Sequence, residues 1–259
     1  MKIIPLGTAG FIPTNGKETA CFLVLIEKTA ILFDAGTGVR RIREIGRHLA
    51  GIEDLHVVFS HFHHDHTAGF TWLLRLWAGN LHFYVPSSPV IESDGLENIE
   101  RLTAPPLFSL PLSKWPNFRG AARFLGEDLE IEGHKIQLLK QRHNGGSVGF
   151  RIGSFSYITD TEPRRHHISF IRGSELVFMD TMHDAADFEA MNISEANPAE
   201  HGWSRGNAQI AHLAGIGRLG LIHVDPLYDH SRCTSLLEET RQIFDASFFP
   251  QEAEVYQAE

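Results

Sequence analysis

The chain carries the stretch His61-Phe62-His63-His64-Asp65-His66 directly after the apolar run Leu55-His56-Val57-Val58-Phe59-Ser60. The apolar run predicts a buried strand. Neutral imidazoles and carboxylates are the ligands that zinc and related divalent ions prefer, and a catalytic ion keeps one position open for water. A solvated, histidine-rich loop is the alternative, but His-x-His-x-Asp-His is a rare spacing for this composition. The stretch therefore predicts a metal centre at the end of a strand.

Alternation along an extended turn divides these side chains between two sites. His61 and His63 point to one side and can share one ion, whereas Asp65 and His66, at the start of the next helix, can reach a second ion. His64 points away and is not counted as a ligand. Two ions about 3.5–4 Å apart can hold a hydroxide between them and bind the oxygens of a phosphate ester. Four ligands cannot fill two sites, so at least three more are expected elsewhere.

Polar residues at the ends of apolar strands supply the missing ligands. His143, Asp160 and His223 each follow an apolar run. In α/β folds, functional groups usually lie at such strand ends. Asp34 lies at the end of another predicted strand and is expected to orient a metal-ligating histidine through a hydrogen bond. The alternative is that its carboxylate stabilises a turn or caps a helix. The candidate metal ligands are therefore His61, His63, Asp65, His66, His143, Asp160 and His223.

Length and charge limit the classes of protein and partner. At 259 residues and 42% hydrophobic content, the chain suits one large α/β domain over residues 1–259. A formal net charge of -9 and a pI near 6.0 argue against a broad nucleic-acid surface, which usually has a pI above about 9. A local basic patch is left open, with ordinary solvated side chains as the alternative. The basic residues concerned are Lys114, Arg119, Arg123, Arg142, Arg151, Arg164 and Arg165.

Cysteine usage and the N-terminal stretch indicate the compartment. Cys21 and Cys233 form no Cys-x-x-Cys motif or even-numbered framework, which fits reduced thiols in a reducing compartment. Pro5 and Gly7 interrupt the N-terminal stretch before a secretory core could form. No apolar run approaches the ~18 residues that a membrane span needs. We therefore expect a cytoplasmic protein without a membrane partner.

Apolar runs and their periodicity predict the secondary structure. Strands are predicted over 2–6, 20–26, 30–33, 55–60, 82–85, 129–131, 134–140, 148–152, 154–158, 176–179 and 219–222. Helices are predicted over 39–49, 67–77, 163–172, 207–214 and 231–243. The proline-rich stretch 86–118 is expected to be irregular. Each half of the chain contains strands followed by helices. This order predicts two sheets packed face to face with helices on the outside.

At this point the sequence resembles the metallo-β-lactamase superfamily nearly from end to end. The matching residues are Asp34-Ala35-Gly36, the 61–66 motif, His143, Asp160 and His223. The sequence looks closest to the ribonuclease-Z-like phosphodiesterase branch through the stretches 143–152, 157–161 and 221–226. The resemblance implies an α/β fold of the αββα four-layer sandwich type with two divalent ions, zinc first and Mn or Fe as alternatives. It also implies the ligand sets: His61, His63 and His143 on one ion, Asp65, His66 and His223 on the other, and Asp160 bridging them.

The sequence departs from ribonuclease Z in two places. A Gly-His-Ser motif supplies a catalytic histidine there, whereas the matching stretch here is Gly202-Trp203-Ser204, with His201 just before it. The candidate catalytic residues are Asp65 and His201. The alternative for His201 is that it is an ordinary surface histidine next to the polar loop 197–200. The long arm with which ribonuclease Z grips transfer RNA has no counterpart between Asp160 and His201. This argues against transfer-RNA processing.

The expected function is metal-dependent hydrolysis of a small phosphodiester through a metal-bridging hydroxide, cyclic nucleotides being one candidate class. The alternatives are hydrolysis of an ester, lactone or thioester, transfer-RNA 3′ processing, and a non-enzymatic metal-bound sensor or interaction domain. The turn Gly145-Gly146-Ser147 favours the phosphodiesterase branch over the ester hydrolases. The expected partner is a small phosphodiester or ester substrate, with nucleic acid disfavoured and a homodimer left open.

Overall fold

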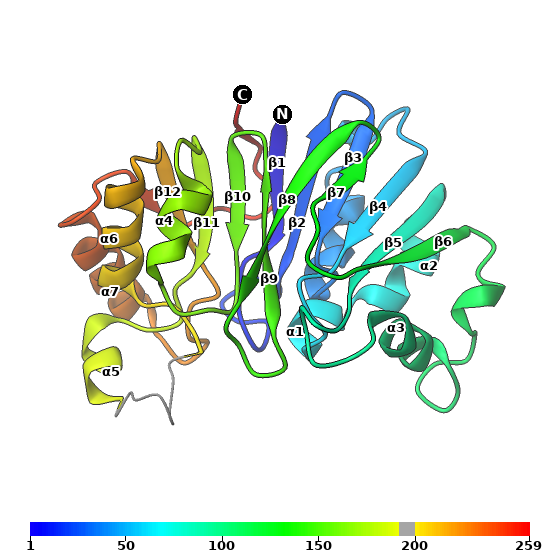
Figure 1. Ribbon diagram of the computed structural model, residues 1–259, viewed down its shortest axis with the longest axis horizontal. Coiled ribbons are helices and arrows are strands. Elements are labelled where there is room, and N and C mark those ends of the chain that lie inside the picture. The colour runs from blue at the N-terminus through cyan, green and yellow to red at the C-terminus, as the bar shows by residue number, and fades with distance from the viewer. Residues whose placement is uncertain (192–199) are drawn as a thin grey trace.

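The computed structural model describes residues 1–191 and 200–259. Among these residues, two seven-stranded sheets lie between two layers of helices, which is the predicted four-layer sandwich (Figure 1). The first sheet contains, in spatial order, β14 (Tyr256–Gln257), β1 (Lys2–Gly7), β2 (Cys21–Ile26), β3 (Thr29–Phe33), β4 (Asp54–Val58), β5 (Asn80–Pro86) and β6 (Phe118–Phe124). The second contains β13 (Ser247–Phe248), β12 (Arg218–Ile222), β11 (Leu176–Asp180), β10 (Phe155–Ile158), β9 (Ser147–Ile152), β8 (His134–Gln141) and β7 (Leu129–Ile131).

Strand β2 explains why the fold has four layers. Phe22 and Val24 point into the core between the two sheets, while Cys21, Leu23 and Leu25 point into the core under the outer helices. Successive side chains of a strand face opposite sides of its sheet, so a strand that is buried on both faces consists of apolar residues throughout. The continuous apolar runs of the sequence therefore belong to sheets that are covered on both sides.

Aromatic rings join the two sheets. Phe22 of the first sheet lies 4.7 Å from Tyr157 of the second, and Phe33 stacks on Phe150 at 4.8 Å between ring centroids. Offset or tilted aromatic pairs at such distances add to the free energy gained by burying their surface. These contacts hold together the sheet edges from which the candidate ligands project.

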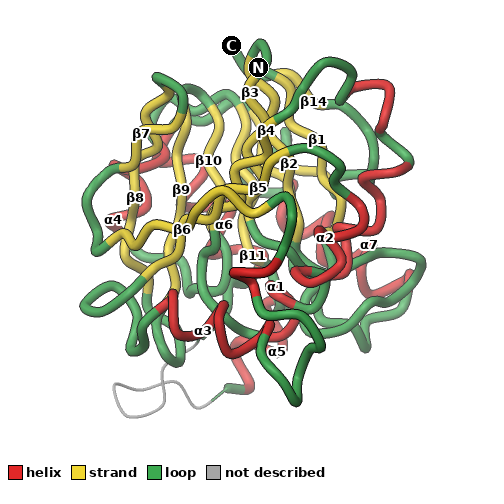
Figure 2. Tube along the Cα trace, turned by 90° about the vertical axis from the view of Figure 1, so that its right-hand side faces the viewer, coloured by secondary structure: helices red, strands yellow, loops and turns green. Residues whose placement is uncertain are grey.

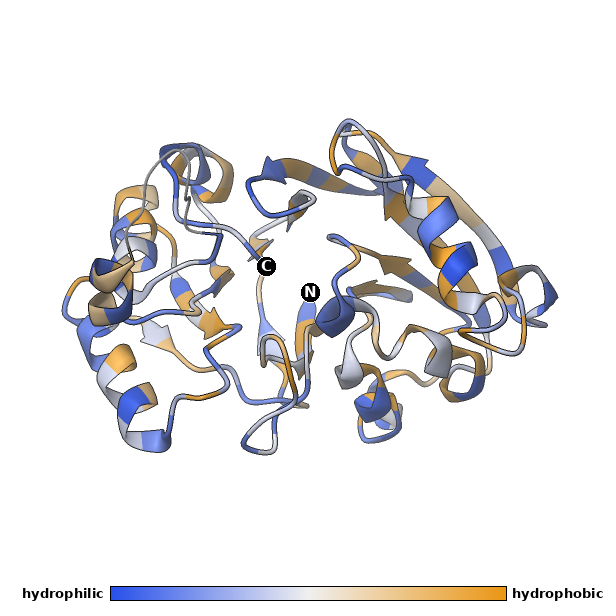
Figure 3. Cartoon of the chain, turned by 90° about the horizontal axis from the view of Figure 1, so that it is seen from below, coloured by the Kyte–Doolittle hydropathy of each residue, from blue (hydrophilic) through white to orange (hydrophobic). Residues whose placement is uncertain are grey.

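Short helices cover both outer faces. Those against the first sheet are η1 (Thr37–Arg43), η2 (Gly46–His48), α1 (His64–Thr67), η3 (Phe70–Trp72), α2 (Leu73–Leu76), α3 (Gly95–Thr103) and η4 (Leu112–Lys114). Those on the side of the second sheet are α4 (Arg165–Ile171), α5 (Ala185–Ala190), α6 (Ser204–Ala214) and α7 (His230–Arg241). Seen from below, the helices form the two flanks and the hydrophobic strands lie between them (Figure 3). No helix in the described ranges is long and apolar enough to cross a membrane.

Two helix predictions were wrong because glycines interrupt them. The region 39–49 forms the 3-10 segments η1 and η2, and Gly46, a poor helix former, is the first residue of η2. The region 67–77 is divided among α1, η3 and α2. The chain packs so closely at Gly69 that an added Cβ would lie 2.2 Å from the carbonyl oxygen of Gly36. The backbone N–H of Gly69 also donates to the Ala35 carbonyl oxygen at 2.9 Å, so it does not continue the hydrogen-bond ladder of a helix.

The prediction of an irregular stretch over 86–118 was also wrong. Helix α3 lies within it and begins at Asp94, whose side chain accepts hydrogen bonds from the backbone N–H groups of Leu96 and Glu97. An aspartate at this position is a standard N-cap, so the sequence carried a signal for this helix. Strand β6 begins at Phe118, earlier than the predicted strands, and its small residues Ala121 and Ala122 gave no apolar run. Helix α5 was likewise not predicted.

Candidate metal centre

The candidate ligands meet at one edge of the sandwich, where several parallel strands end. Strands β3 and β4 pair in parallel, as do β10, β11 and β12, so their carboxyl ends share an edge. Helix α1 lies at this lower edge together with α3 and α5 (Figure 2). Asp34, Asp160 and His223 follow three of these strands with φ of 59°, 46° and 57°. Left-handed backbone is costly for residues other than glycine and clusters at functional sites.

The first group of donors contains His61, His63, His143 and Asp160, whose ligand atoms lie within 4.8 Å of one another. Nδ1 of His63 lies 3.0 Å from Nε2 of His143. Oδ2 of Asp160 lies 3.6 Å from Nε2 of both His61 and His143. The structure therefore brings together the residues that the sequence analysis assigned to one ion.

The second group contains Asp65, His66, His223 and again Asp160. Nε2 of His223 lies 3.0 Å from Oδ2 of Asp65 and 3.5 Å from Oδ2 of Asp160. Nε2 of His66 lies 3.1 Å from Oδ1 of Asp160. Asp160 is the member common to both groups, and its two oxygens face different histidines. His64, which was not predicted as a ligand, belongs to neither group and is exposed.

Two buried nitrogen atoms test whether this arrangement fits metal ions. Within the described part of the chain, Nε2 of His61 and Nε2 of His66 are buried and make no hydrogen bond, although buried polar groups are normally paired. Oδ1 of Asp160 lies 3.1 Å from Nε2 of His66 but is not placed to form one. The other nitrogen of each ring is occupied: Nδ1 of His61 lies 2.9 Å from the Ser60 hydroxyl, and Nδ1 of His66 lies 2.8 Å from Asp34. A ring whose Nδ1–H is held in this way directs the Nε2 lone pair into the centre. Imidazole and carboxylate donors in two adjoining groups fit a pair of divalent cations.

Asp34 lies behind the candidate ligands, in the position expected of a carboxylate that orients a histidine. Its Oδ2 accepts hydrogen bonds at 2.8 Å from His66 Nδ1, the Ser60 hydroxyl and the Tyr157 hydroxyl. Its Oδ1 accepts the Ser60 backbone N–H at 2.7 Å. Ser60 and Tyr157 were not predicted as site residues, because Ser60 ends an apolar run and Tyr157 lies within a predicted core strand.

The charges in the centre alter the pKa values of its histidines. Burial lowers the pKa of His61, and the neighbouring His66 adds to this effect. Burial also disfavours charge on His66 and His223, but the carboxylates around them outweigh it and raise both pKa values, that of His223 to about 9. A ligand imidazole must be neutral, so metal binding at this centre requires the release of protons.

His201 lies inside the site rather than on the surface. Its Nδ1 is 2.8 Å from Oδ2 of Asp180, and its ring lies parallel to that of His223 with centroids 5.1 Å apart. Burial disfavours its charged form, but Asp180 outweighs this and raises the pKa of His201. Residues 197–199 of the loop considered in the surface alternative lie outside the described residues. Trp203 stacks on Phe188 of α5, at 3.4 Å between ring centroids.

Asp180 is the main functional candidate that the sequence analysis missed. It ends β11, an otherwise apolar strand, and is buried. Asp180, His201 and His223 form a third group with donor atoms within 4.8 Å of one another. The signal was the one that identified Asp160 and His223, a polar residue closing an apolar strand.

The loop before β2 closes over the second group. The backbone N–H of Phe11 donates to Oδ2 of Asp65 at 2.9 Å. A Cβ at Gly10 would lie 2.3 Å from Nδ1 of His223, so only glycine allows the loop to approach this closely. The loop thereby contacts both Asp65 and His223.

Comparison with known families agrees with this geometry. The family described as the Beta-lactamase superfamily domain matches residues 29–224, which include all seven candidate ligands. The chain belongs to this superfamily. Members are metal-dependent hydrolases, so the protein is an enzyme of that class, and the alternative of a non-enzymatic sensor is not supported.

Individual relatives match 95% or more of the chain. Ribonuclease Z of Haloarcula marismortui is 26% identical over 305 aligned residues, which cover 95% of this chain and 92% of that protein. The metallo-beta-lactamase fold protein YhfI from Bacillus subtilis has a TM-score of 0.76 and 22% identity, covering 98% of both chains. A diphosphatase from the PhnP family has a TM-score of 0.72 and 16% identity, covering 100% of this chain and 98% of that one. The predicted resemblance to the ribonuclease-Z-like branch is confirmed, and the two solved structures share the fold.

Proposed function

We propose that this chain is a dinuclear metal-dependent phosphodiesterase that hydrolyses a small phosphodiester. The observation that carries the proposal is the pair of donor groups joined by Asp160, since a carboxylate common to two groups suits two adjacent ions. His61, His63 and His143 would hold one ion, and Asp65, His66 and His223 the other. Ions bound there supply Lewis acidity and an activated water. We propose zinc, with Mn and Fe as the alternatives.

The protein's own groups then position the substrate and move a proton. His201 is proposed as the general acid that protonates the leaving oxygen, because its Nδ1 is held by Asp180 and its ring lies against His223. Asp65 is proposed as a ligand and catalytic carboxylate, and the Phe11 N–H fixes its orientation. Trp203 has only an indole N–H that does not titrate near neutral pH, so it cannot replace His201 in this role.

Several features favour a phosphodiester over a carboxylic ester, lactone or thioester. The relative named Ribonuclease Z and the structure named as a diphosphatase both carry names for cleavage at phosphorus. The turn Gly145-Gly146-Ser147 belongs to the phosphodiesterase-like pattern of the sequence, and the Ser147 hydroxyl donates to the Asp160 carbonyl oxygen at 2.9 Å. This bond supports the left-handed turn that presents Asp160. Cyclic nucleotides are one candidate class of substrate.

Transfer-RNA 3′ processing is the second candidate, favoured by the name of the relative at 26% identity. Two observations count against it. The net charge of -9 gives little electrostatic attraction to a polyanion. The alignment with Ribonuclease Z runs over 305 residues, more than this chain contains, so that relative has segments without a counterpart here.

A direct comparison of rates tests the proposed reaction. The purified protein would be loaded with Zn, Mn or Fe and assayed on bis-p-nitrophenyl phosphate, on a lactone and on a thioester. We expect the phosphodiester to be hydrolysed with the highest kcat/KM. Faster hydrolysis of the lactone or thioester would assign the protein to the other hydrolase class.

We also propose that residues 1–259 form one hydrolase domain in the cytoplasm. The core between the sheets contains residues from both halves of the chain, such as Ile31 and Phe178, which supports a single folding unit. Cys21 and Cys233 are unpaired, which supports a reducing compartment.

A further inference from the structure

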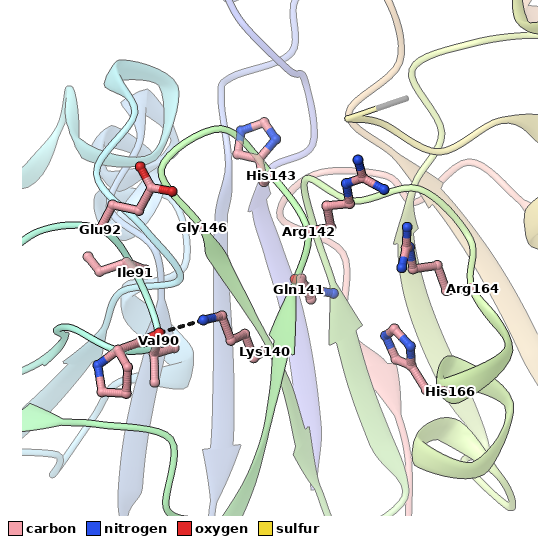
Figure 4. A pocket seen from close by; sticks show the side chains of 11 residues that line it. Val90, Ile91, Glu92, Lys140, Gln141, Arg142, His143, Gly146, Arg164 and His166 are labelled. Atoms are coloured by element: carbon pink, nitrogen blue, oxygen red, sulfur yellow. Dashed lines mark hydrogen bonds between the residues drawn. The ribbon is translucent and has the colours of Figure 1, made fainter. Parts of the chain in front are cut away.

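A cavity of about 470 Å³ lies next to the second donor group, and none of the described residues that line it is a candidate metal ligand. Its walls come from the loop between β1 and β2, the segment that follows His223, helix α7 and the segment after β13. None of these described lining residues belongs to the cavity of Figure 4, which His143 lines and which therefore adjoins the metal centre itself. Cavities of this size are typical of sites for small molecules.

Two walls of the cavity connect it to the metal centre. Ala9 and Val224 line the cavity and pair with each other in a parallel β-bridge. The residues next to them in the chain, Gly10 and His223, make the close contact described above. The cavity is therefore a neighbour of the second donor group and separate from its ligands.

Part of the cavity wall is apolar. Val224, Leu237 and Phe249 line it and pack against the core under the helices of the second sheet, yet each side chain is only partly buried. Apolar surface that stays in contact with water gains free energy when a ligand covers it. The cavity therefore offers a binding surface for a hydrocarbon ring.

Lys17 supplies a cation to the same cavity. Its Nζ lies 5.1 Å from the centre of the Phe249 ring, and within residues 1–191 and 200–259 it forms no ion pair. Burial lowers the pKa of Lys17, and nearby acidic groups only partly oppose this effect. One of these groups is Glu252, but its carboxylate already accepts Nε–H of Arg41 at 2.7 Å and two backbone N–H groups. The partly buried ammonium of Lys17 thus lacks a carboxylate of its own.

The charges of the lining favour a ligand with a single negative charge. Among the described residues that line the cavity, Lys17 is the one lysine or arginine and Asp225 is the one carboxylate. A phosphate dianion would be repelled by Asp225 and would lack the planar pairs of donors that arginine provides. A carboxylate needs one cationic partner, and the amides of Asn15 and Gln251 supply further hydrogen-bond donors.

We propose that this cavity is a binding site for a small monocarboxylate that carries an aromatic or alicyclic ring. The carboxylate pairs with the Lys17 ammonium, and the ring packs on the apolar surface of Leu237 and Phe249. The site does not depend on the proposed phosphodiesterase reaction, because no described lining residue is a candidate metal ligand.

A matched pair of probes tests the role of charge. Benzoate and benzamide have nearly the same shape and differ by one negative charge. NMR titration of the purified, metal-loaded protein should give an affinity for benzoate about tenfold or more above that for benzamide. Lys17→Met should reduce this ratio to about one, and Lys17→Arg should retain most of it. Lys28→Met removes an exposed lysine outside the cavity and, as the control, should leave the ratio unchanged.

Cys233 reports whether the probe lies in the cavity. Its side chain lines the cavity and is partly exposed, whereas Cys21 is buried. Benzoate should slow the alkylation of Cys233 by iodoacetamide, measured by mass spectrometry, in the native protein and not in Lys17→Met. Benzoate bound only to the metal ions would leave the alkylation rate unchanged, and that result would overturn the proposed site.

Two further measurements test the class of ligand. Leu237→Ala should weaken benzoate and benzamide by similar factors, because it removes apolar contact from both. Inorganic phosphate should protect Cys233 from alkylation less than benzoate does. Equal protection by phosphate would overturn the assignment to a monocarboxylate, and a benzoate-to-benzamide ratio near one in the native protein would overturn the role of Lys17.

Discussion

Oδ2 of Asp180 lies 2.8 Å from Nδ1 of His201 and holds the histidine ring against His223. Asp180 closes β11 and its side chain is fully buried, while the side chain of His201 remains 21% exposed. A buried carboxylate that holds the Nδ1–H of an imidazole leaves Nε2 available for proton exchange. This relationship supports His201 as the proton donor of the proposed reaction.

His201→Ala should affect substrates according to their leaving groups. We expect a loss in kcat/KM of roughly a hundredfold or more on an alkyl phosphodiester, whose leaving oxygen needs a proton. The loss on a p-nitrophenyl diester should be small, because the phenolate leaves without protonation. His212→Ala, which removes an exposed histidine of α6, is the control. Equal, small effects of His201→Ala on both substrates would eliminate this role.

The shared position of Asp160 predicts the metal content of variants. The native protein should contain close to two ions per chain by elemental analysis after gentle purification. Asp160→Ala should lose both ions, because its side chain belongs to both donor groups. His63→Ala, which belongs to the first group alone, should retain about one. Full metal content and activity in Asp160→Ala would contradict the bridging assignment.

The sequence predicted which polar residues lie together better than it predicted the positions of the helices, for a physical reason. A polar residue that ends an apolar strand is a local signal, and it identified Asp34, His143, Asp160 and His223. Asp180 carries the same signal, but the strand was predicted over 176–179 and so did not include it, whereas β11 extends to Asp180. Its partner His201 lies 21 residues away in a loop, and neither strand pattern nor spacing predicts that the two meet.

The wrong helix predictions depended on contacts between distant segments. Apolar residues at helical spacing over 67–77 favour one helix, but the backbone N–H of Gly69 donates to the Ala35 carbonyl oxygen instead of within a helix. Ala35 follows β3 and lies 34 residues before Gly69, so the local sequence pattern gives no sign of this bond. By contrast, α3 could have been predicted from its aspartate N-cap, which is a local feature.

Asp34→Asn should weaken metal binding, although Asp34 is not itself a candidate ligand, because it removes a hydrogen bond to the candidate ligand His66. Its carboxylate accepts four hydrogen bonds, and an amide would turn its donor group toward His66 Nδ1 or the Tyr157 hydroxyl. We expect metal affinity to fall by about 10–100-fold and the free energy of unfolding by about 3 kcal/mol. Metal titration and urea denaturation measure the two effects. Ser60→Ala keeps the contacts of Asp34 to His66 and Tyr157 and should be milder; an unchanged metal affinity in Asp34→Asn would contradict the role.

Precursor transfer RNA should be a poor substrate. An acidic protein gains little from the counterion release that drives binding to nucleic acids. Cleavage assays with precursor transfer RNA, and binding measured at several salt concentrations, test this expectation. Tight binding that falls steeply with salt, together with clean 3′ cleavage, would return the protein to the function named for its relative Ribonuclease Z.

His167 should make stability depend on pH at a site away from the metal centre. Its side chain is fully buried in α4, and its Nδ1 accepts the backbone N–H of Arg164 at 3.0 Å. Burial, with a smaller effect of His166, lowers the pKa of His167 from 6.5 to about 3.

The sign of this effect follows from proton binding. Below about pH 6.5 the unfolded chain binds a proton at His167, whereas the folded chain does not. The contribution of His167 to the free energy of unfolding is therefore fully present above that pH and is lost as the pH falls toward 3. One proton corresponds to about 1.4 kcal/mol per pH unit within this window. The free energy of unfolding, measured by urea denaturation, should fall between pH 7.5 and pH 5 in the native protein. In His167→Gln this fall should be smaller by about 2 kcal/mol. His230→Gln removes an exposed histidine as the control, and an identical pH dependence in His167→Gln and the native protein would show that His167 does not contribute.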